Sequence, residues 1–388
     1  MNTREQLEHR KKLLDDAIRQ RKMERVPHVS NFALWPVLDY GAKLSVACRD
    51  WDLMEKIQRS FMDKYQFDCS GMSATAGFLC NPPRMLDSIG KGYNVFDDEA
   101  GTVMLEDFVL MLEDEYDDFV ADLPGLIWNK LLPRKFERWG ELTVGDFKEA
   151  IDEYVRFGNY MQHMSEVCVE EYGLPSSAGH MINMPGIEIL FNNFRGIKGT
   201  SRDMRRIPDK VMQVVDYLDI HDDVVYNLFM ETPPTDTFAF GTFIGMLAHN
   251  FMSLSQFEKY LWPYLDKIIK AAVKADSTVF IFAEGVISRF YEFFQDVPAG
   301  HVAIQIEQDD IFEVKAKLPN ICVVGGMTTQ LLGDGTAKQC VDYAKFLCDE
   351  LGREGGFILS QDKMMSYLRD AKSENLKAVC DFIADYAL

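Results

Sequence analysis

The feature that most constrains the fold is a regular alternation of short apolar segments with amphipathic helices in the last third of the chain. Residues 253–275, "SLSQFEKYLWPYLDKIIKAAVKA", carry apolar side chains at helical spacing behind a Ser-rich N-cap, which predicts a long helix. Apolar runs typical of strands follow at 278–283, 301–307, 321–327 and 355–361. Segments that predict helices lie between and after them, at 286–296, 310–318, 336–351 and 373–388.

Short apolar strands that alternate with helices predict a parallel sheet with right-handed crossovers. Several such units in succession favour a barrel over a nucleotide-binding sheet, and neither GxGxxG nor GxxxxGK[ST] follows any of the strands. We therefore expect an α/β fold, a (β/α)8 TIM barrel, formed as a single domain over residues 1–388. Residues 1–25 should form an N-terminal helix, and the barrel over 26–388 should carry a helical insertion at about 100–140.

The N-terminal half is less regular and predicts an irregular helical extension around the first strands. Strands are expected at 26–34 and 65–71, with a helix between them. The acidic segment 106–136 predicts two short helices, and 144–173 and 210–230 each predict a long one.

The chain is strongly acidic, which bears on its partners. It has 41 Lys and Arg residues against 61 Asp and Glu, a formal net charge of -20. This charge repels phosphate backbones and anionic lipid headgroups, so nucleic acids and membrane surfaces are not expected as partners. The N-terminal segment has no apolar leader core, and no later run reaches the roughly 18 apolar residues of a membrane span, so we expect a cytoplasmic protein.

The 8 cysteines are scattered without a CxxC pair. Five of them lie in apolar segments of helical or strand period, as reduced core thiols do. Neither a disulfide framework nor a zinc knuckle is expected.

In a βα barrel the catalytic groups lie at the C-terminal ends of the strands, where the loops of all units converge. The strand ends expected here are at 68–70, 180–183, 240–242, 284, 307, 325–327 and 360–363. Glu284 follows an apolar strand directly and precedes a Gly, so burial should raise its pKa or demand a cation or donor partner. Glu307 holds the same position one unit later. The two carboxyls could share a metal, or one could donate a proton, or each could cap the next helix.

Two histidines and several apolar residues also lie near the expected strand ends. His180 and His249 occur in Gly-flanked, loop-like stretches and are candidate catalytic residues, although neither makes HxH or HExxH spacing. An apolar pocket for an aromatic ligand could be lined by Phe240, Phe282, Met181 and Met327, and packing in the core is the alternative for each of them. Asn183 is a further candidate substrate contact. A Ser nucleophile is unsupported because GxSxG is absent.

Six segments together resemble the uroporphyrinogen decarboxylase superfamily in order and spacing. They are "KMERVPHVSNF", "LMEKIQRSFMDKYQFDCSG", "LSQFEKYLWPYLDKIIKA", "VFIFAEG", "VVGGMTTQLLGDGT" and "GGFILSQ" with "SENLKAV". The resemblance covers about residues 3–385 and implies a (β/α)8 barrel. It also implies one of two activities, because the superfamily contains tetrapyrrole decarboxylases and methyltransferases that work with a corrinoid protein.

The decarboxylases carry an Arg-rich signature that holds substrate carboxylates. The matching stretch here, "VPHVSNFALWPVLDYG", belongs to a segment without any Arg from Pro27 to Ala47. An acidic protein without those arginines is poorly suited to a porphyrinogen with eight carboxylates.

The methyltransferases present zinc through a His-x-Cys pair and a later Cys. By resemblance the pair aligns on Phe282 and Glu284, and the later Cys falls near 361–363, so the thiolate ligands are absent. A harder site on Glu284 and Glu307, with Asp362 or a His, is implied instead. Related corrinoid enzymes that demethylate phenyl methyl ethers are similar in using carboxylate-containing zinc sites.

The primary hypothesis is a methyltransferase that moves a methyl group from a small methylated donor, expected to be a methoxyaromatic ether, to the cobalt of a separate corrinoid (cobalamin) protein. Its partners would be that corrinoid protein and the small-molecule donor. The alternatives are a decarboxylase of a tetrapyrrole or related acid, and a barrel without catalysis that acts as a partner-binding subunit.

Overall fold

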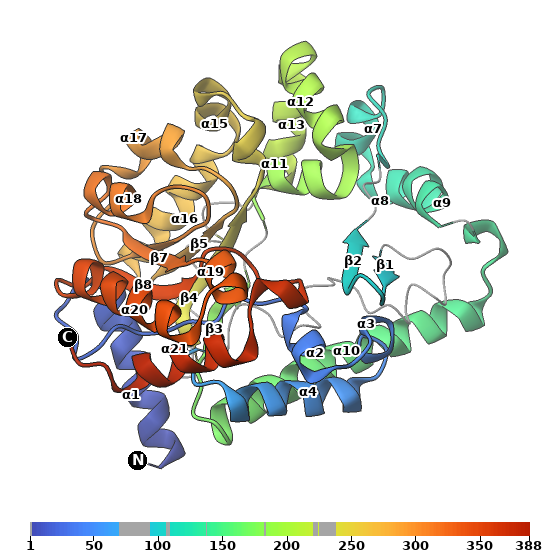
Figure 1. Cartoon of the computed structure of the whole chain (residues 1–388). Helices are drawn as coiled ribbons and strands as arrows, with labels where there is room; N and C mark the ends of the chain where they lie inside the picture. The colour runs from blue at the N-terminus through green and yellow to red at the C-terminus, as the bar shows by residue number, and fades with distance from the viewer. Residues whose placement is uncertain are drawn as a thin grey trace.

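A parallel sheet of six strands forms the centre of the molecule (Figure 1). The structure is a computed structural model, which describes residues 2–69, 94–105, 109–136, 138–181, 184–219, 224 and 238–388. The strands, which neighbour one another in sequence order, are β3 (Ser176–Met181), β4 (Phe238–Met246), β5 (Val279–Ala283), β6 (Val302–Ile306), β7 (Cys322–Met327) and β8 (Phe357–Gln361).

Two short segments near the N-terminus extend this sheet beyond β8. His28 forms a parallel bridge with Leu359 of β8, and Val29 forms one with Cys69. The order therefore continues from β8 to the segment at 28–29 and then to Cys69, which gives eight positions. This is the arrangement of a (β/α)8 barrel, as expected, although no pairing between Cys69 and β3 closes the ring within the described ranges.

Helices surround the sheet (Figure 1). The first part of the chain contains α1 (Thr3–Ile18), α2 (Trp35–Tyr40), α3 (Leu44–Ala47), α4 (Trp51–Lys64), α7 (Tyr116–Ala121), α8 (Leu123–Leu126), α9 (Leu132–Lys135), α10 (Val144–Glu170), α11 (Gly186–Ile189), α12 (Gly196–Arg206) and α13 (Pro208–Leu218). The second part contains α15 (Leu254–Tyr260), α16 (Trp262–Lys274), α17 (Tyr291–Phe294), α18 (Ile311–Lys317), α19 (Thr329–Asp334), α20 (Ala337–Leu347) and α21 (Ser373–Asp385).

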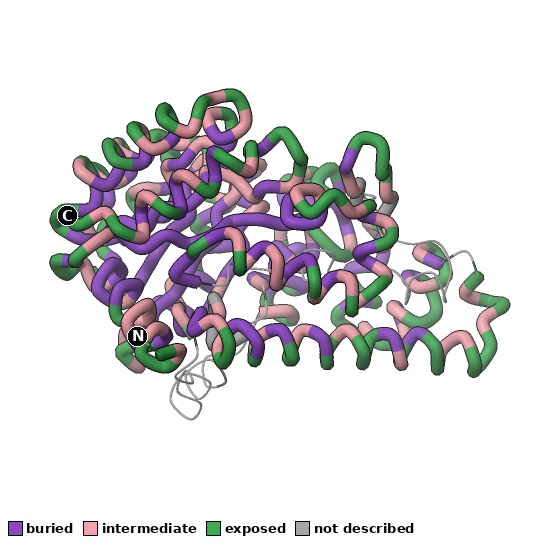
Figure 2. The backbone as a smooth tube through the Cα atoms, turned by 60° about the horizontal axis from the view of Figure 1, so that its bottom comes forward, coloured by how far each residue is buried: buried purple, intermediate pink, exposed green. Residues whose placement is uncertain are grey.

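The region expected as a helical insertion also contains a hairpin. Strands β1 (Asn94–Asp97) and β2 (Thr102–Leu105) pair antiparallel, and α7, α8 and α9 follow them. Next comes α10, a long helix that runs along one edge of the molecule with an exposed outer face (Figure 2). No helix in the described ranges is long and apolar enough to cross a bilayer.

The strands and helices after residue 276 lie within a few residues of their predicted bounds, but two predictions for the preceding segment are wrong. The helix expected over 253–275 is two helices that meet at Leu261. Pro263 explains the break, because proline has no N–H to continue the ladder of helical hydrogen bonds. The strand end expected at 240–242 is the first half of β4, which continues to Met246.

Helix α1 closes the N-terminal end of the barrel. Its residues Leu13, Leu14, Ala17 and Ile18 share one apolar cluster with the inward residues Phe240, Phe280, Val324 and Ile358 of the strands. A buried ion pair holds the segment after α1, because the Arg25 guanidinium donates to both oxygens of Asp68 at 2.7 and 2.6 Å. Since one end of the barrel is filled, a substrate has to enter at the C-terminal strand ends.

Candidate active site

Two carboxyl groups lie side by side at the C-terminal ends of β5 and β6. Phe282 of β5 is the partner of Gln305 of β6 in the parallel register. Glu284 and Glu307 each come two residues later, and residues two apart in a strand lie on the same face. Phe282 packs in the barrel interior. The register therefore directs both carboxyls toward the barrel mouth, as the sequence predicts.

The two carboxyls have different surroundings. The backbone N–H of Gly285 donates to the Glu307 carboxylate. The Glu284 carboxyl is half-buried and has no hydrogen bond or ion pair to any residue that the structure describes. Burial, and then the neighbouring charge of Glu307, raise the pKa of Glu284. The surroundings thus favour the protonated form of Glu284, as an acid that donates a proton requires.

A short turn after β4 holds the backbone of Glu284 in place. Asn250, in this turn, donates from Nδ2 to the carbonyl oxygens of Glu284 at 2.7 Å and Leu247 at 3.1 Å. Its Oδ1 accepts the N–H of Val286 at 3.3 Å. Gly285 has a φ of +80°, in the left-handed region, and a Cβ at this position would clash with the Asn250 side chain, so only glycine fits there. Asn250 is therefore a positioning residue for Glu284.

Replacing Asn250 by Ala should lower kcat on the order of tenfold with little change in KM for the substrate, because the backbone of Glu284 loses its support. Steady-state kinetics measure this. Asn320→Ala is the matched control, since Asn320 also holds two carbonyl oxygens, at 2.9 and 2.7 Å, but near α17. Equal losses in the two variants would contradict a specific role for Asn250.

Glu188 of α11 is a third carboxyl at this end of the barrel, and the sequence reasoning missed it. It is fully buried, and its Oε1 accepts the N–H groups of Leu247 at 2.8 Å and Ala248 at 2.7 Å. Burial raises its pKa to about 7, and the charge of Glu284 adds to the effect. The signal was present in the sequence as a single acidic residue in the apolar run "MPGIEIL".

His249 is buried but does not join this group. Its two ring nitrogens have no hydrogen-bond partner among the described residues, and its ring packs edge-on against Phe290 at 5.9 Å. Burial, and then the charge of Arg289, lower the pKa of His249 to about 4, so the imidazole is neutral at ordinary pH. Its catalytic role stays a prediction. His180 lies in β3 rather than in a loop, Met181 is the last residue of that strand, as expected, and Asn183 lies outside the described residues.

The expected metal site is not formed by the side chains that the structure describes. Among them, no three His, Cys, Asp or Glu residues are placed to hold a metal ion. Asp362 follows β8, three strands away from β5, and its Oδ1 accepts the N–H groups of Thr329 at 3.0 Å and Lys363 at 2.8 Å. This donor set does not fit zinc, so we derive no step through a metal.

The predicted apolar contacts divide into two groups. Phe282 lies in the barrel interior near the mouth, where it can contact a ligand. Phe240 lies deeper, with its ring 4.8 Å from that of Phe280, because β4 continues for six residues beyond it. Met327 is fully buried in the cluster between sheet and helices, on the same side as Val323. Phe240 and Met327 are therefore core residues in this structure, which is the alternative that the sequence left open for them.

Neutral polar side chains lie on β6, on β8 and in the segment that pairs with β8. The side chain of Gln361 accepts the N–H of Asn31 at 2.8 Å, and Gln305 Nε2 donates to the carbonyl of Gln361 at 2.9 Å. Asn31 Nδ2 and Ser360 Oγ are buried without a hydrogen-bond partner in the described part of the chain. Since a buried polar group without a partner is costly, these two atoms are candidates to bind polar groups of a substrate.

Comparisons with known proteins agree with this architecture. Residues 243–386 match the family model described as uroporphyrinogen decarboxylase (URO-D). Among curated protein sequences no significant match was found. Among solved structures, the chain is similar to a methyltransferase from Methanosarcina mazei, with 14% sequence identity, a TM-score of 0.60 and coverage of 97% of this chain and 98% of that chain. The family match and the shared fold confirm the likeness to the uroporphyrinogen decarboxylase superfamily.

Proposed function

We propose that this protein is a methyltransferase that takes a methyl group from a small methylated donor, expected to be a methoxyaromatic ether. The acceptor is the cobalt of a corrinoid carried by a separate protein. The observation that most supports the proposal is the Glu284 carboxyl, which lies at the barrel mouth with a raised pKa and, among the described residues, no cation or hydrogen-bond donor. An ether needs a proton donor of this kind, because the phenolate that it releases is a poor leaving group unless its oxygen is protonated or otherwise stabilised.

In the proposed step, the methyl group moves to the corrinoid and the proton of Glu284 moves to the ether oxygen. The cobalt of the reduced corrinoid, carried by the partner protein, would supply the electron pair for a new bond to the methyl carbon. The bond between that carbon and the ether oxygen breaks. The electron pair of that bond stays on the oxygen, which takes the proton of Glu284 and leaves as a neutral phenol. Glu284 is then ionised beside Glu307, and this repulsion favours its return to the protonated form by uptake of a proton from water.

Charge at the mouth favours a neutral donor over a polycarboxylate. Glu188, Glu284 and Glu307 place three carboxyl groups at this end of the barrel, and no Arg lies in 27–47, the segment that begins beside β8. Asn31 and Ser360 offer uncharged polar atoms instead. A substrate with several carboxylates would meet repulsion here, so decarboxylation of a tetrapyrrole is the less favoured activity.

The test is an assay of the purified protein with a reduced corrinoid protein and a panel of methoxyarenes and methylamines. We expect a demethylated product and a methylated corrinoid in equal amounts for at least one methoxyarene. Absence of transfer from every donor would contradict the proposal. Turnover of a porphyrinogen, with release of carbon dioxide, would assign the protein to the decarboxylases instead.

A further inference from the structure

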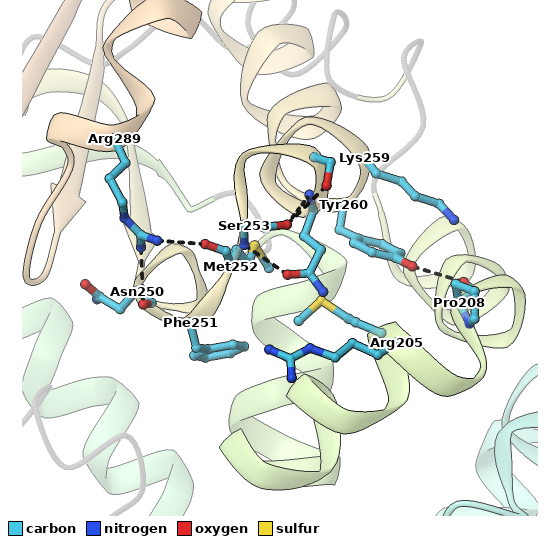
Figure 3. Close-up of a pocket in the computed structure, with 12 residues that line it drawn as sticks. Arg205, Pro208, Asn250, Phe251, Met252, Ser253, Lys259, Tyr260 and Arg289 are labelled. Atoms are coloured by element: carbon cyan, nitrogen blue, oxygen red, sulfur yellow. Dashed lines mark hydrogen bonds between the residues drawn. The ribbon is translucent and has the colours of Figure 1, made fainter.

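A cavity lies on the outer rim of the barrel, between α12, α13 and α15. Its volume is about 700 Å³. Arg205 reaches into it from α12, Lys259 and Tyr260 border it from α15, and Phe251 borders it from the turn after β4 (Figure 3). Asn250, which holds the Glu284 backbone, also lines the cavity, whereas the catalytic carboxyls do not. The cavity therefore adjoins the turn that positions Glu284 and is separate from the barrel mouth.

The cavity is cationic in a protein of net charge -20. Among the described residues, its lining contains Arg205, Lys259 and Arg289 and no Asp or Glu. Arg289 is engaged, because it donates to the carbonyl oxygens of Met252 at 3.0 Å and His249 at 3.1 Å. Such a cluster of cations without acidic neighbours in its lining attracts an anion.

Arg205 and Lys259 are available to a ligand. Both are exposed, and Arg205 makes no hydrogen bond or ion pair with any residue that the structure describes. The ammonium of Lys259 lies 5.0 Å from the centre of the Tyr260 ring, a contact that leaves its N–H donors available. The guanidinium of Arg205, from α12, and the ammonium of Lys259, from α15, can each donate charge-assisted hydrogen bonds to a carboxylate or phosphate.

The rest of the lining combines an apolar part with the polar side chains of Asn250, Ser253, Ser255 and Gln256. Met204, Phe251 and Tyr260 provide apolar walls, and the hydroxyl of Tyr260 donates to the carbonyl of Pro208 at 3.2 Å, which fixes the ring. A pocket that combines fixed aromatic walls with a few polar groups is typical of small-molecule sites. The ligand that suits both features has an apolar body and an anionic group.

We propose that this cavity binds a small organic anion, an aromatic or aliphatic body that carries a carboxylate or a phosphate. The site is separate from the proposed methyl-transfer site, and its ligand differs in charge from the neutral donor expected there. Binding at the cavity does not depend on whether the barrel mouth transfers methyl groups.

The test is calorimetry with phenyl phosphate, benzoate, benzamide and inorganic phosphate as probes. Phenyl phosphate or benzoate should bind more tightly than uncharged benzamide, and the better of the two identifies the anionic group. The double variant Arg205→Ala/Lys259→Ala should weaken that binding on the order of tenfold or more. Arg206→Ala is the matched control, since Arg206 follows Arg205 in α12 with its side chain 63% exposed and does not line the cavity.

Several outcomes would overturn the proposal. They are equal binding of benzamide and benzoate, equal losses in the control and the double variant, or no binding of either aromatic anion. Tighter binding of inorganic phosphate than of phenyl phosphate would overturn the role of the apolar walls. Arg205→Glu adds a test by charge reversal, and it should abolish anion binding while the thermal unfolding temperature stays near that of the wild type, because the side chain is exposed.

Discussion

Replacing Glu284 by Gln should lower the rate of methyl transfer by roughly 10²–10⁴-fold, the usual contribution of a general acid. The amide has nearly the shape of the protonated carboxyl, but it cannot give a proton to the leaving oxygen. Because the Glu284 side chain is half-buried and has no partner among the described residues, the substitution removes no interaction that holds the fold. Single-turnover kinetics with the methoxyarene and the reduced corrinoid protein measure the loss directly.

The pH profile separates a proton donor from other roles of Glu284. A general acid works in its protonated form, so the rate should be high below the raised pKa of Glu284 and fall as pH rises through it. Glu307→Gln keeps an acceptor for the Gly285 N–H but removes the charge that raises the pKa of Glu284. In this variant the fall in rate should therefore occur at lower pH. An unchanged rate in Glu284→Gln would return Glu284 to a structural role. Loss of bound zinc from that variant would make it a metal ligand instead.

The barrel and the carboxyl pair could be predicted from the sequence because both depend on short-range pattern. The strands β5 to β8 are short, mostly apolar segments bounded by helices, so their ends could be placed within a few residues. Once two neighbouring strands end in Glu284 and Glu307 at equal spacing, a parallel register is enough to bring the carboxyls together.

The remaining parts of the site depend on contacts that no local pattern contains. Glu188 meets the N–H groups of Leu247 and Ala248, about 60 positions away, only because α11 folds back over the end of β4. Asn250 reaches the backbone at the end of β5 in the same way. Phe240 does not lie at a strand end, because β4 has nine residues and continues to Met246.

Glu188→Gln should remove much of the pH dependence of stability between about pH 4.5 and 7. The folded state raises the pKa of Glu188 to about 7, mainly through burial, from an ordinary value of 4.5. Within this window the folded protein binds more protons than the unfolded chain, so the free energy of unfolding falls as pH rises. The loss is complete above the folded pKa and absent below 4.5. The difference between the folded and unfolded pKa values of Glu188 corresponds to a few kcal/mol in the free energy of unfolding, at about 1.4 kcal/mol for each pKa unit.

The side-chain amide of the Glu188→Gln variant can still accept the N–H groups of Leu247 and Ala248, but it carries no charge at any pH. The variant should therefore be the more stable protein at pH 7.5 and differ little from the wild type at pH 4.5. Urea unfolding at both values measures the two free energies, and the difference between variant and wild type cancels the other titrating groups. Glu170→Gln, the same change at an exposed position of α10, is the control and should alter neither value. If the stability of the wild type changed with pH in the same way as that of Glu188→Gln, the prediction would be wrong. Glu188 would then be ionised in the folded state, with its charge stabilised by the two N–H groups.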